Sequence, residues 1–146
     1  MTAVHAPDLE GVDHVHVFVR DRAAAVQWYA SVLGFEPVES LRSWATRDGP
    51  LTIGSRSGAI HLALFEGGTA GSATTIALAA TASQFLAWRA HLGHTLGQPL
   101  APVDHTLAWS LYFTDPDGNP FEITTYDHAQ VASQLGPPAG RGGDRS

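Results

Sequence analysis

The chain has 146 residues, a formal net charge of -6 and no cysteine. This length suits one domain with its own core, and 44% hydrophobic with 15% charged residues is a globular composition. The acidic balance argues against a nucleic-acid partner, and the lack of cysteine excludes disulfides, thiolate metal sites and cysteine nucleophiles. No segment has the pattern of a signal peptide or a membrane span, so we expect a cytoplasmic protein without a membrane partner.

The first half of the chain predicts a strand, a helix and three more strands. Residues 12–20 alternate, with valines on one face and two histidines and a phenylalanine on the other. Asp21 is placed to cap a helix over about 22–33, and Gly34 is placed to end it. The buried stripe of this helix is expected to be Val26, Tyr29, Val32 and Leu33. The later strands are expected near 35–42, 51–56 and 59–66.

The same order begins again after a stretch rich in Gly, Ala, Ser and Thr. A helix is expected over 82–92, with Gly93 at its end. The sequence Asp-Pro-Asp-Gly-Asn at 115–119 supplies turn chemistry between two alternating segments and predicts a hairpin. The strands of this half are expected near 74–80, 97–103, 109–114 and 121–126.

Each half therefore has the order βαβββ, which predicts an α+β fold. We expect a single domain over residues 1–135, made of tandem modules at about 12–66 and 73–127. The two modules would form a cupped mixed β-sheet with the helices on its outer face. The Gly- and Pro-rich segment 136–146 is predicted to be a disordered tail.

One face of the predicted sheet collects residue types that bind metals. Glu122 lies in mid-strand between apolar neighbours, where a half-buried carboxylate needs a cation or a metal as partner. His14 and His61 fall on the same face by the alternation of their strands. Two imidazoles and one carboxylate suit a non-haem iron(II) site or a similar divalent metal. The structural alternatives are that the histidines are packed and that Glu122 pairs with an arginine.

Longer motifs resemble the vicinal oxygen chelate superfamily. They are the βαβββ repeat, the opening VDHVHVFVRD…WYASVLGF and the closing YFTDPDGNPFEI, and they span about residues 12–127. This superfamily includes glyoxalase I, extradiol ring-cleavage dioxygenases, fosfomycin-modifying enzymes and bleomycin-binding proteins. The spacing from Val103 through Tyr112 to Glu122 also resembles the signature of the extradiol dioxygenases.

The resemblance implies roles for individual residues. Glu122 resembles the carboxylate ligand of the metal and His14 a histidine ligand, while Tyr112 and His105 resemble the catalytic pair of the second sphere. It implies a metal-dependent enzyme that acts on a small substrate with two vicinal oxygens, most closely an extradiol-type dioxygenase that cleaves a catechol-like ring. The implied cofactor is a divalent ion, with Fe(II) favoured over Mn, Ni or Zn, and the implied assembly is a homodimer.

One departure concerns the second histidine ligand of the dioxygenases. The resemblance places it where this chain has Thr75, and threonine is a poor ligand for iron(II). Three alternatives are open: His61 completes a relocated triad with His14 and Glu122, His61 is an acid–base group, or the site has lost its metal. We take the relocated triad as the prediction.

Two other functions are alternative hypotheses. A glyoxalase- or epimerase-like reaction would need the same metal but no oxygen. A metal-free drug-binding or resistance protein would instead hold an aromatic or cationic ligand by stacking, for which Trp44 and Tyr126 are candidates.

Overall fold

A computed structural model describes residues 5–136 of the chain. Its helices and strands, in chain order, are β1 (Val15–Val19), α1 (Arg22–Leu33), β2 (Glu36–Pro37), the 3₁₀ helix η1 (Glu39–Trp44), β3 (Leu51–Gly54), β4 (His61–Glu66), β5 (Ile76–Ala79), α2 (Ala82–Thr95), β6 (Val103–Asp104), β7 (Trp109–Thr114), β8 (Pro120–Thr125) and α3 (His128–Leu135). Residues 5–14 contain no helix or strand, and most of the predicted disordered tail lies outside the described residues.

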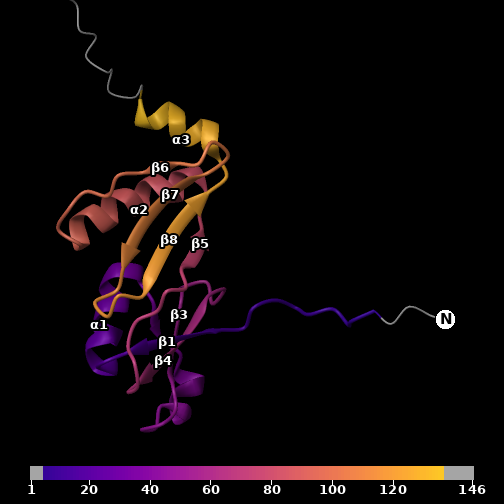
Figure 1. Ribbon diagram of the computed structural model, residues 1–146, viewed down its shortest axis with the longest axis vertical. Coiled ribbons are helices and arrows are strands. Elements are labelled where there is room, and N and C mark those ends of the chain that lie inside the picture. The colour runs from indigo at the N-terminus through magenta and orange to yellow at the C-terminus, as the bar shows by residue number, and fades with distance from the viewer. Residues whose placement is uncertain (1–4, 137–146) are drawn as a thin grey trace, which may run out of the picture.

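The strands form two sheets of four. Sheet A has the order β1-β4-β3-β2, and sheet B has the order β5-β8-β7-β6. In each sheet the outer strand that precedes the helix pairs in parallel with the last strand, and the other pairings are antiparallel. The predicted α+β class and the two βαβββ modules are thus confirmed. Within one chain each module has a sheet of its own, and Figure 1 shows the modules one above the other.

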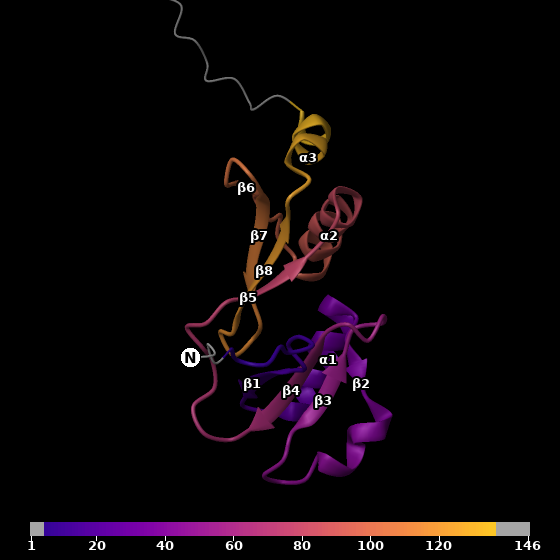
Figure 2. The same ribbon diagram turned by 90° about the vertical axis from the view of Figure 1, so that its right-hand side faces the viewer.

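Each sheet has one face covered by helices and one open face. On β1, Val17 and Val19 are buried in the core together with Tyr29 of α1 and Leu64 of β4. The predicted placement of the helices on the apolar face is therefore confirmed for sheet A. Figure 2 shows α2 lying along one side of sheet B, with α3 beyond the end of that sheet. The alternate residues of the strands, which include His61, Tyr112 and Glu122, lie on the opposite faces, which we call the open faces.

The first helix has the predicted bounds. The Asp21 carboxylate accepts a hydrogen bond from the Ala24 N–H at 3.1 Å, and Gly34 takes a left-handed conformation with φ of 70°. The buried positions are Ala25, Tyr29, Val32 and Leu33, while Val26 is only partly buried. The predicted stripe was therefore correct at three of its positions.

The second helix is longer than predicted. It continues past Gly93 to Thr95, because the stopping residue is Gly97, whose φ of 73° breaks the helical path one residue after the Leu96 cap. At its start, Thr81 accepts a hydrogen bond from the Gln84 N–H, and the Gln84 side chain accepts one from the Thr81 N–H. The prediction that Gly93 ends the helix was wrong.

Two predicted strands are mostly absent and one helix was missed. The segment 39–42 belongs to η1, where Arg42 pairs with Glu39 three residues earlier at 2.6 Å. The segment 97–103 is irregular apart from Val103, because Gly97 is left-handed and two prolines in it have no N–H to donate. Helix α3, anchored by fully buried Val131, was not predicted.

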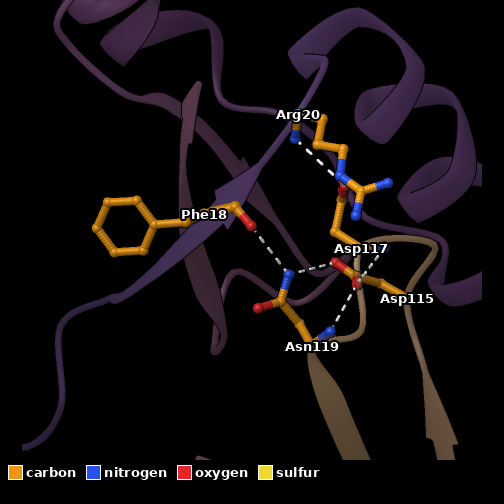
Figure 3. Close-up of polar contacts among 5 residues, drawn as sticks. All are labelled: Phe18, Arg20, Asp115, Asp117 and Asn119. Atoms are coloured by element: carbon orange, nitrogen blue, oxygen red, sulfur yellow. Dashed lines mark hydrogen bonds and ion pairs between the residues drawn. The ribbon is translucent and has the colours of Figure 1, made fainter. Parts of the chain in front are cut away.

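The two modules are joined through the turn between β7 and β8. The buried Asp115 carboxylate accepts hydrogen bonds from the Tyr29 hydroxyl at 2.7 Å and from the Asn119 backbone N–H and side-chain amide at 2.8 Å. The Asn119 amide also donates to the Phe18 carbonyl at 3.1 Å, and the Arg20 N–H donates to Asp117 at 3.3 Å (Figure 3). Burial, followed by the bond to Asp115, raises the pKa of Tyr29 above its ordinary value. The second module is therefore fixed against the C-terminal end of β1.

Candidate functional site

The open face of sheet A carries a pair of histidines at the start of β1. His14 Nε2 and His16 Nε2 lie 3.1 Å apart, and the two rings stack with centroids 5.1 Å apart and planes at 19°. The other ring nitrogen of His14, Nδ1, lies 2.7 Å from a carboxylate oxygen of Asp13. The strand alternation explains this arrangement, since residues two apart on a strand point to the same face.

The rings of this face continue along β1 and β4. The His16 ring lies 4.7 Å from the Phe65 ring, and Phe18 stacks on Phe65 with centroids 5.6 Å apart. Phe18 keeps 40% of its surface exposed, although it is a large apolar residue. The result is a row of flat side chains suited to a flat, partly apolar ligand.

His61 begins β4 on the same face. The paired residues Val15 and Leu62 directly follow His14 and His61, so the two histidines stand at neighbouring strand ends. The His61 ring, however, lies over Gly54 of β3, where an added Cβ would be 2.9 Å from His61 Cδ2. Residue 54 must therefore be small for His61 to hold this position.

The open face of sheet B carries a hydrogen-bonded network centred on Glu122. Ser110 Oγ donates to Glu122 Oε1 at 2.6 Å, and the Tyr112 hydroxyl donates to the same oxygen at 3.4 Å. His105 Nε2 lies 2.9 Å from the Tyr112 hydroxyl oxygen. Because the hydroxyl has one proton, His105 is the donor in that last contact. The structure thus brings together three predicted residues, Glu122, Tyr112 and His105.

Ser110 was not predicted as a site residue. It is buried and stands two residues before Tyr112, on the same face of β7. The two-residue spacing from Tyr112 was the signal in the sequence that could have identified Ser110. In the structure the register pairs Tyr112 with Glu122 and Ser110 with Thr124. Glu122 also pairs with Ala77 on β5, so Thr75 is diagonal to Glu122 and is exposed before the strand begins.

A single chain keeps the two faces apart. Among residues 5–136 there is no group of three or more His, Cys, Asp or Glu side chains placed to hold a metal ion. His61 belongs to sheet A and His14 lies directly before β1 of that sheet, whereas Glu122 belongs to sheet B. The predicted catalytic pair is therefore assembled around Glu122, and the triad is not assembled within one chain.

The donor atoms nevertheless fit a divalent metal. Glu122 is half-buried, and within the described part of the chain its only hydrogen bonds fall on Oε1, which leaves Oε2 to bind a cation. Asp13 holds Nδ1 of His14, so that Nε2 points to the open side. A carboxylate behind a histidine is the usual second shell of a metal ligand. Nitrogen and oxygen donors of this kind suit Fe(II), Mn(II), Ni(II) or Zn(II).

A cavity lined by other residues lies elsewhere. It has a volume of about 640 Å³ and is lined by residues of both modules, including Phe35, Arg56, Trp88 and His91. None of the predicted metal or catalytic residues lines it. The aromatic candidates are exposed: Trp44 is 57% exposed on η1 and Tyr126 is 80% exposed after β8.

Comparison with family models gives one match. Residues 11–123 match the Glyoxalase/Bleomycin resistance protein/Dioxygenase superfamily. The chain belongs to this superfamily. The match covers both modules from the segment before β1 to within β8, and it includes the histidine pair and the Glu122 network. The resemblance seen in the motifs is confirmed at the level of the superfamily, and the extradiol dioxygenases are not singled out.

Solved structures of the superfamily share the fold at low identity. A FosX fosfomycin resistance protein from Listeria monocytogenes, complexed with Mn(II) and sulfate, is 15% identical with a TM-score of 0.61 over 88% of this chain and 100% of that chain. FosX from Mesorhizobium loti is 24% identical with a TM-score of 0.58, over 81% and 93%. A glyoxalase/bleomycin resistance protein/dioxygenase domain from Frankia is 20% identical with a TM-score of 0.64, over 82% and 93%. At these identities the likeness establishes the fold alone.

Two further findings do not specify the function. A search of curated proteins finds no match. In the described part of the chain, no helix combines the length and the apolar character needed to cross a membrane.

Proposed function

We propose that this protein is a metal-dependent enzyme acting on a small molecule with two vicinal oxygens. The observation that carries the proposal is the half-buried Glu122, which has one oxygen held by Ser110 and Tyr112 and the other available for a cation. His14, oriented by Asp13, offers an imidazole nitrogen on the other open face. The third ligand is a second imidazole, for which the sequence favours His61.

The bound ion would polarise the two oxygens of the substrate and lower their pKa values. Two histidines and one carboxylate favour Fe(II), with Mn, Ni and Zn as alternatives. The Mn(II) in the Listeria relative supports a divalent ion in general. Around it, the His105–Tyr112 pair would bind and orient the substrate, because the Tyr112 hydroxyl accepts a hydrogen bond from His105 Nε2 and donates its own proton to Glu122.

The reaction we favour is extradiol-type cleavage of a catechol-like ring. The row of rings at His16, Phe65 and Phe18 supports a flat aromatic substrate, which would stack there. A glyoxalase- or epimerase-like reaction would use the same donors, with Tyr112 moving a proton, but would consume no oxygen. The cytoplasm is the expected location.

A second copy of the chain would complete the site. The sheets end in β1 and β5, and the outer edge of each strand has backbone groups that no other strand of the chain pairs in the described residues. Association of two copies would bring sheet A of one against sheet B of the other and join His14 to Glu122. Analytical ultracentrifugation at micromolar concentration tests this, and a monomeric mass with full metal content would contradict it.

The decisive experiment measures metal content and turnover together. Purified protein is incubated with Fe(II), Mn(II), Ni(II) or Zn(II), desalted and analysed for bound metal, and oxygen uptake is followed on a panel of catechols. We expect about one ion per chain, with uptake for the iron form. Bound metal without uptake would favour the glyoxalase-like reaction. A protein that stays empty with all four ions would contradict the proposal and leave a metal-free binding protein, with exposed Trp44 and Tyr126 as its stacking groups.

A further inference from the structure

We propose that His16 supplies the second imidazole of the metal site, so that His14 and His16 together form a two-histidine chelate on β1. The inference rests on the proposed function, because it concerns the ligands of that same metal. It replaces His61, the histidine that the sequence favours, with His16, which lies two residues after His14.

The first argument is the distance between the two nitrogens. Imidazole nitrogens bind divalent metals at about 2.0–2.1 Å, so two of them in neighbouring coordination positions lie about 3 Å apart. His14 Nε2 and His16 Nε2 are 3.1 Å apart. Without a metal, one nitrogen must carry a proton and donate to the other. A divalent ion would replace that single proton with two bonds to the same pair of atoms.

The second argument is that both rings are already held. Asp13 contacts His14 Nδ1 at 2.7 Å, which places the proton on Nδ1 and leaves Nε2 as the basic atom. The His16 ring lies against the Phe65 ring at 4.7 Å and stacks on His14. Side chains that are fixed before binding lose less conformational entropy when a ligand arrives.

The third argument is the position of His61. Its ring lies over Gly54 on β3, on the side of β4 away from β1. No hydrogen bond or ring contact joins His61 to His14 in the described part of the chain, whereas His14 and His16 share both. His61 would have to leave the surface of Gly54 to reach the ion that His14 binds.

Exposure also favours the pair as a site. His14 and His16 are both exposed on the open face, His14 with 41% of its side chain accessible. A second copy carrying Glu122 can therefore approach them without displacing any segment among residues 5–136. The complete donor set would be His14, His16 and the Glu122 of the second copy, which is again two imidazoles and one carboxylate.

The test compares three histidine-to-glutamine variants of the full chain. His16→Gln removes the proposed ligand, His61→Gln removes the alternative one, and His94→Gln is a matched control on the exposed side of α2. A fourth variant, His16→Phe, keeps a ring against Phe65 and removes both nitrogens. Circular dichroism and thermal unfolding establish that each variant folds. Affinity for Mn(II) and Zn(II) is measured by calorimetric titration, and bound metal by elemental analysis.

Loss of a second-shell partner typically lowers metal affinity about 10–100-fold, so loss of a direct ligand should lower it by about 100-fold or more. We expect that loss in both His16 variants, and near wild-type affinity in the His61 and His94 variants. Pulsed electron paramagnetic resonance of the Cu(II)-loaded proteins gives a second reading. It should detect two imidazole nitrogens in wild type and in His61→Gln, and one in His16→Phe.

The outcomes separate the two proposals. A wild-type protein that binds none of the ions contradicts the proposed function itself. Wild-type protein that binds metal, with unchanged affinity and two nitrogens in the His16 variants, overturns the role of His16 and leaves the metalloenzyme proposal standing.

Discussion

The open faces of the two sheets carry different kinds of potential metal ligand. Sheet A offers imidazoles and aromatic rings, with His14 and His16 side by side and Phe65 next to them. Sheet B offers oxygen atoms, with Glu122 held by Ser110 and Tyr112. The modules share the order βαβββ, yet the polar contacts of one open face centre on paired imidazoles and those of the other on a carboxylate.

This difference explains why one chain does not form the predicted triad. Imidazoles without a carboxylate leave the charge of a divalent ion uncompensated, and a single carboxylate with hydroxyl neighbours binds it weakly. Each face therefore needs the other to bind a divalent ion tightly. The expected homodimer would bring the two faces together. The following changes test how far the two faces depend on each other.

The largest effect should come from Glu122→Gln. The amide keeps an oxygen that can accept from Ser110 and Tyr112, but it removes the charge that this hydrogen-bonded network offers to a cation. We expect bound metal to fall to background in elemental analysis, although His14 and the other histidines are unchanged. Glu39→Gln is the matched control, since Glu39 is an exposed partner of Arg42 on η1. Retention of metal by Glu122→Gln would show that sheet A binds the ion alone.

The next effect should come from Tyr112→Phe. This change removes the hydroxyl between His105 and Glu122 but no proposed metal ligand. Proton transfer by a positioned side chain typically contributes about 10²–10⁴-fold to a rate, so turnover should fall by that factor while metal content stays the same. Oxygen uptake on the catechol panel measures it, with Tyr126→Phe as control for an exposed tyrosine. Loss of metal together with turnover would place Tyr112 among the groups that hold the ion.

A smaller effect concerns the contact that fixes one module against the other. Tyr29→Phe removes the buried hydroxyl that donates to Asp115, and a hydrogen bond to a charged group contributes about 1.5–3 kcal/mol. We expect the free energy of unfolding in urea to fall by that amount at pH 8, with metal content retained. Tyr126→Phe, which changes an exposed side chain, should leave it unchanged.

The same contact gives a pH dependence with a definite sign. Burial and the bond to Asp115 raise the pKa of Tyr29 in the folded state, so its contribution to stability is complete below the pKa of an unfolded tyrosine, about 10. The contribution should decline as the pH rises above that value. Urea unfolding between pH 8 and pH 11 should show this decline in wild type and a weaker one in Tyr29→Phe. Equal slopes in the two proteins would contradict the proposed linkage.

The smallest effect should come from Thr75→Ala. Thr75 is exposed before β5 and stands diagonal to Glu122, which pairs with Ala77. If both imidazole ligands come from sheet A, metal content should remain within error of wild type. A clear loss of metal would instead indicate that sheet B contributes two of the metal ligands. Thr75→His provides the converse test, since an added imidazole beside Glu122 should raise the affinity for iron.

Local sequence patterns were enough to predict the elements that depend on neighbouring residues. The alternation of β1, β7 and β8, the Asp21 and Gly34 caps of α1 and the turn at 115–119 all follow from preferences that act within a few positions. Glu122 was also found this way, because a carboxylate among apolar neighbours in a strand stands out from its own segment. Two glycines, Gly93 and Gly97, could each have ended the second helix, and the prediction chose the wrong one.

Which side chains meet could be learned only from the folded chain. Ser110 joins Glu122, and the His61 ring lies over Gly54 while His14 faces His16. These choices depend on the direction of each side chain and on the sheet register, which a strand's periodicity leaves open. The separation of the two open faces depends on contacts between residues far apart in the chain, such as Tyr29 with Asp115. Such a contact is set by how the folded modules pack, and so no local pattern in the sequence contains it.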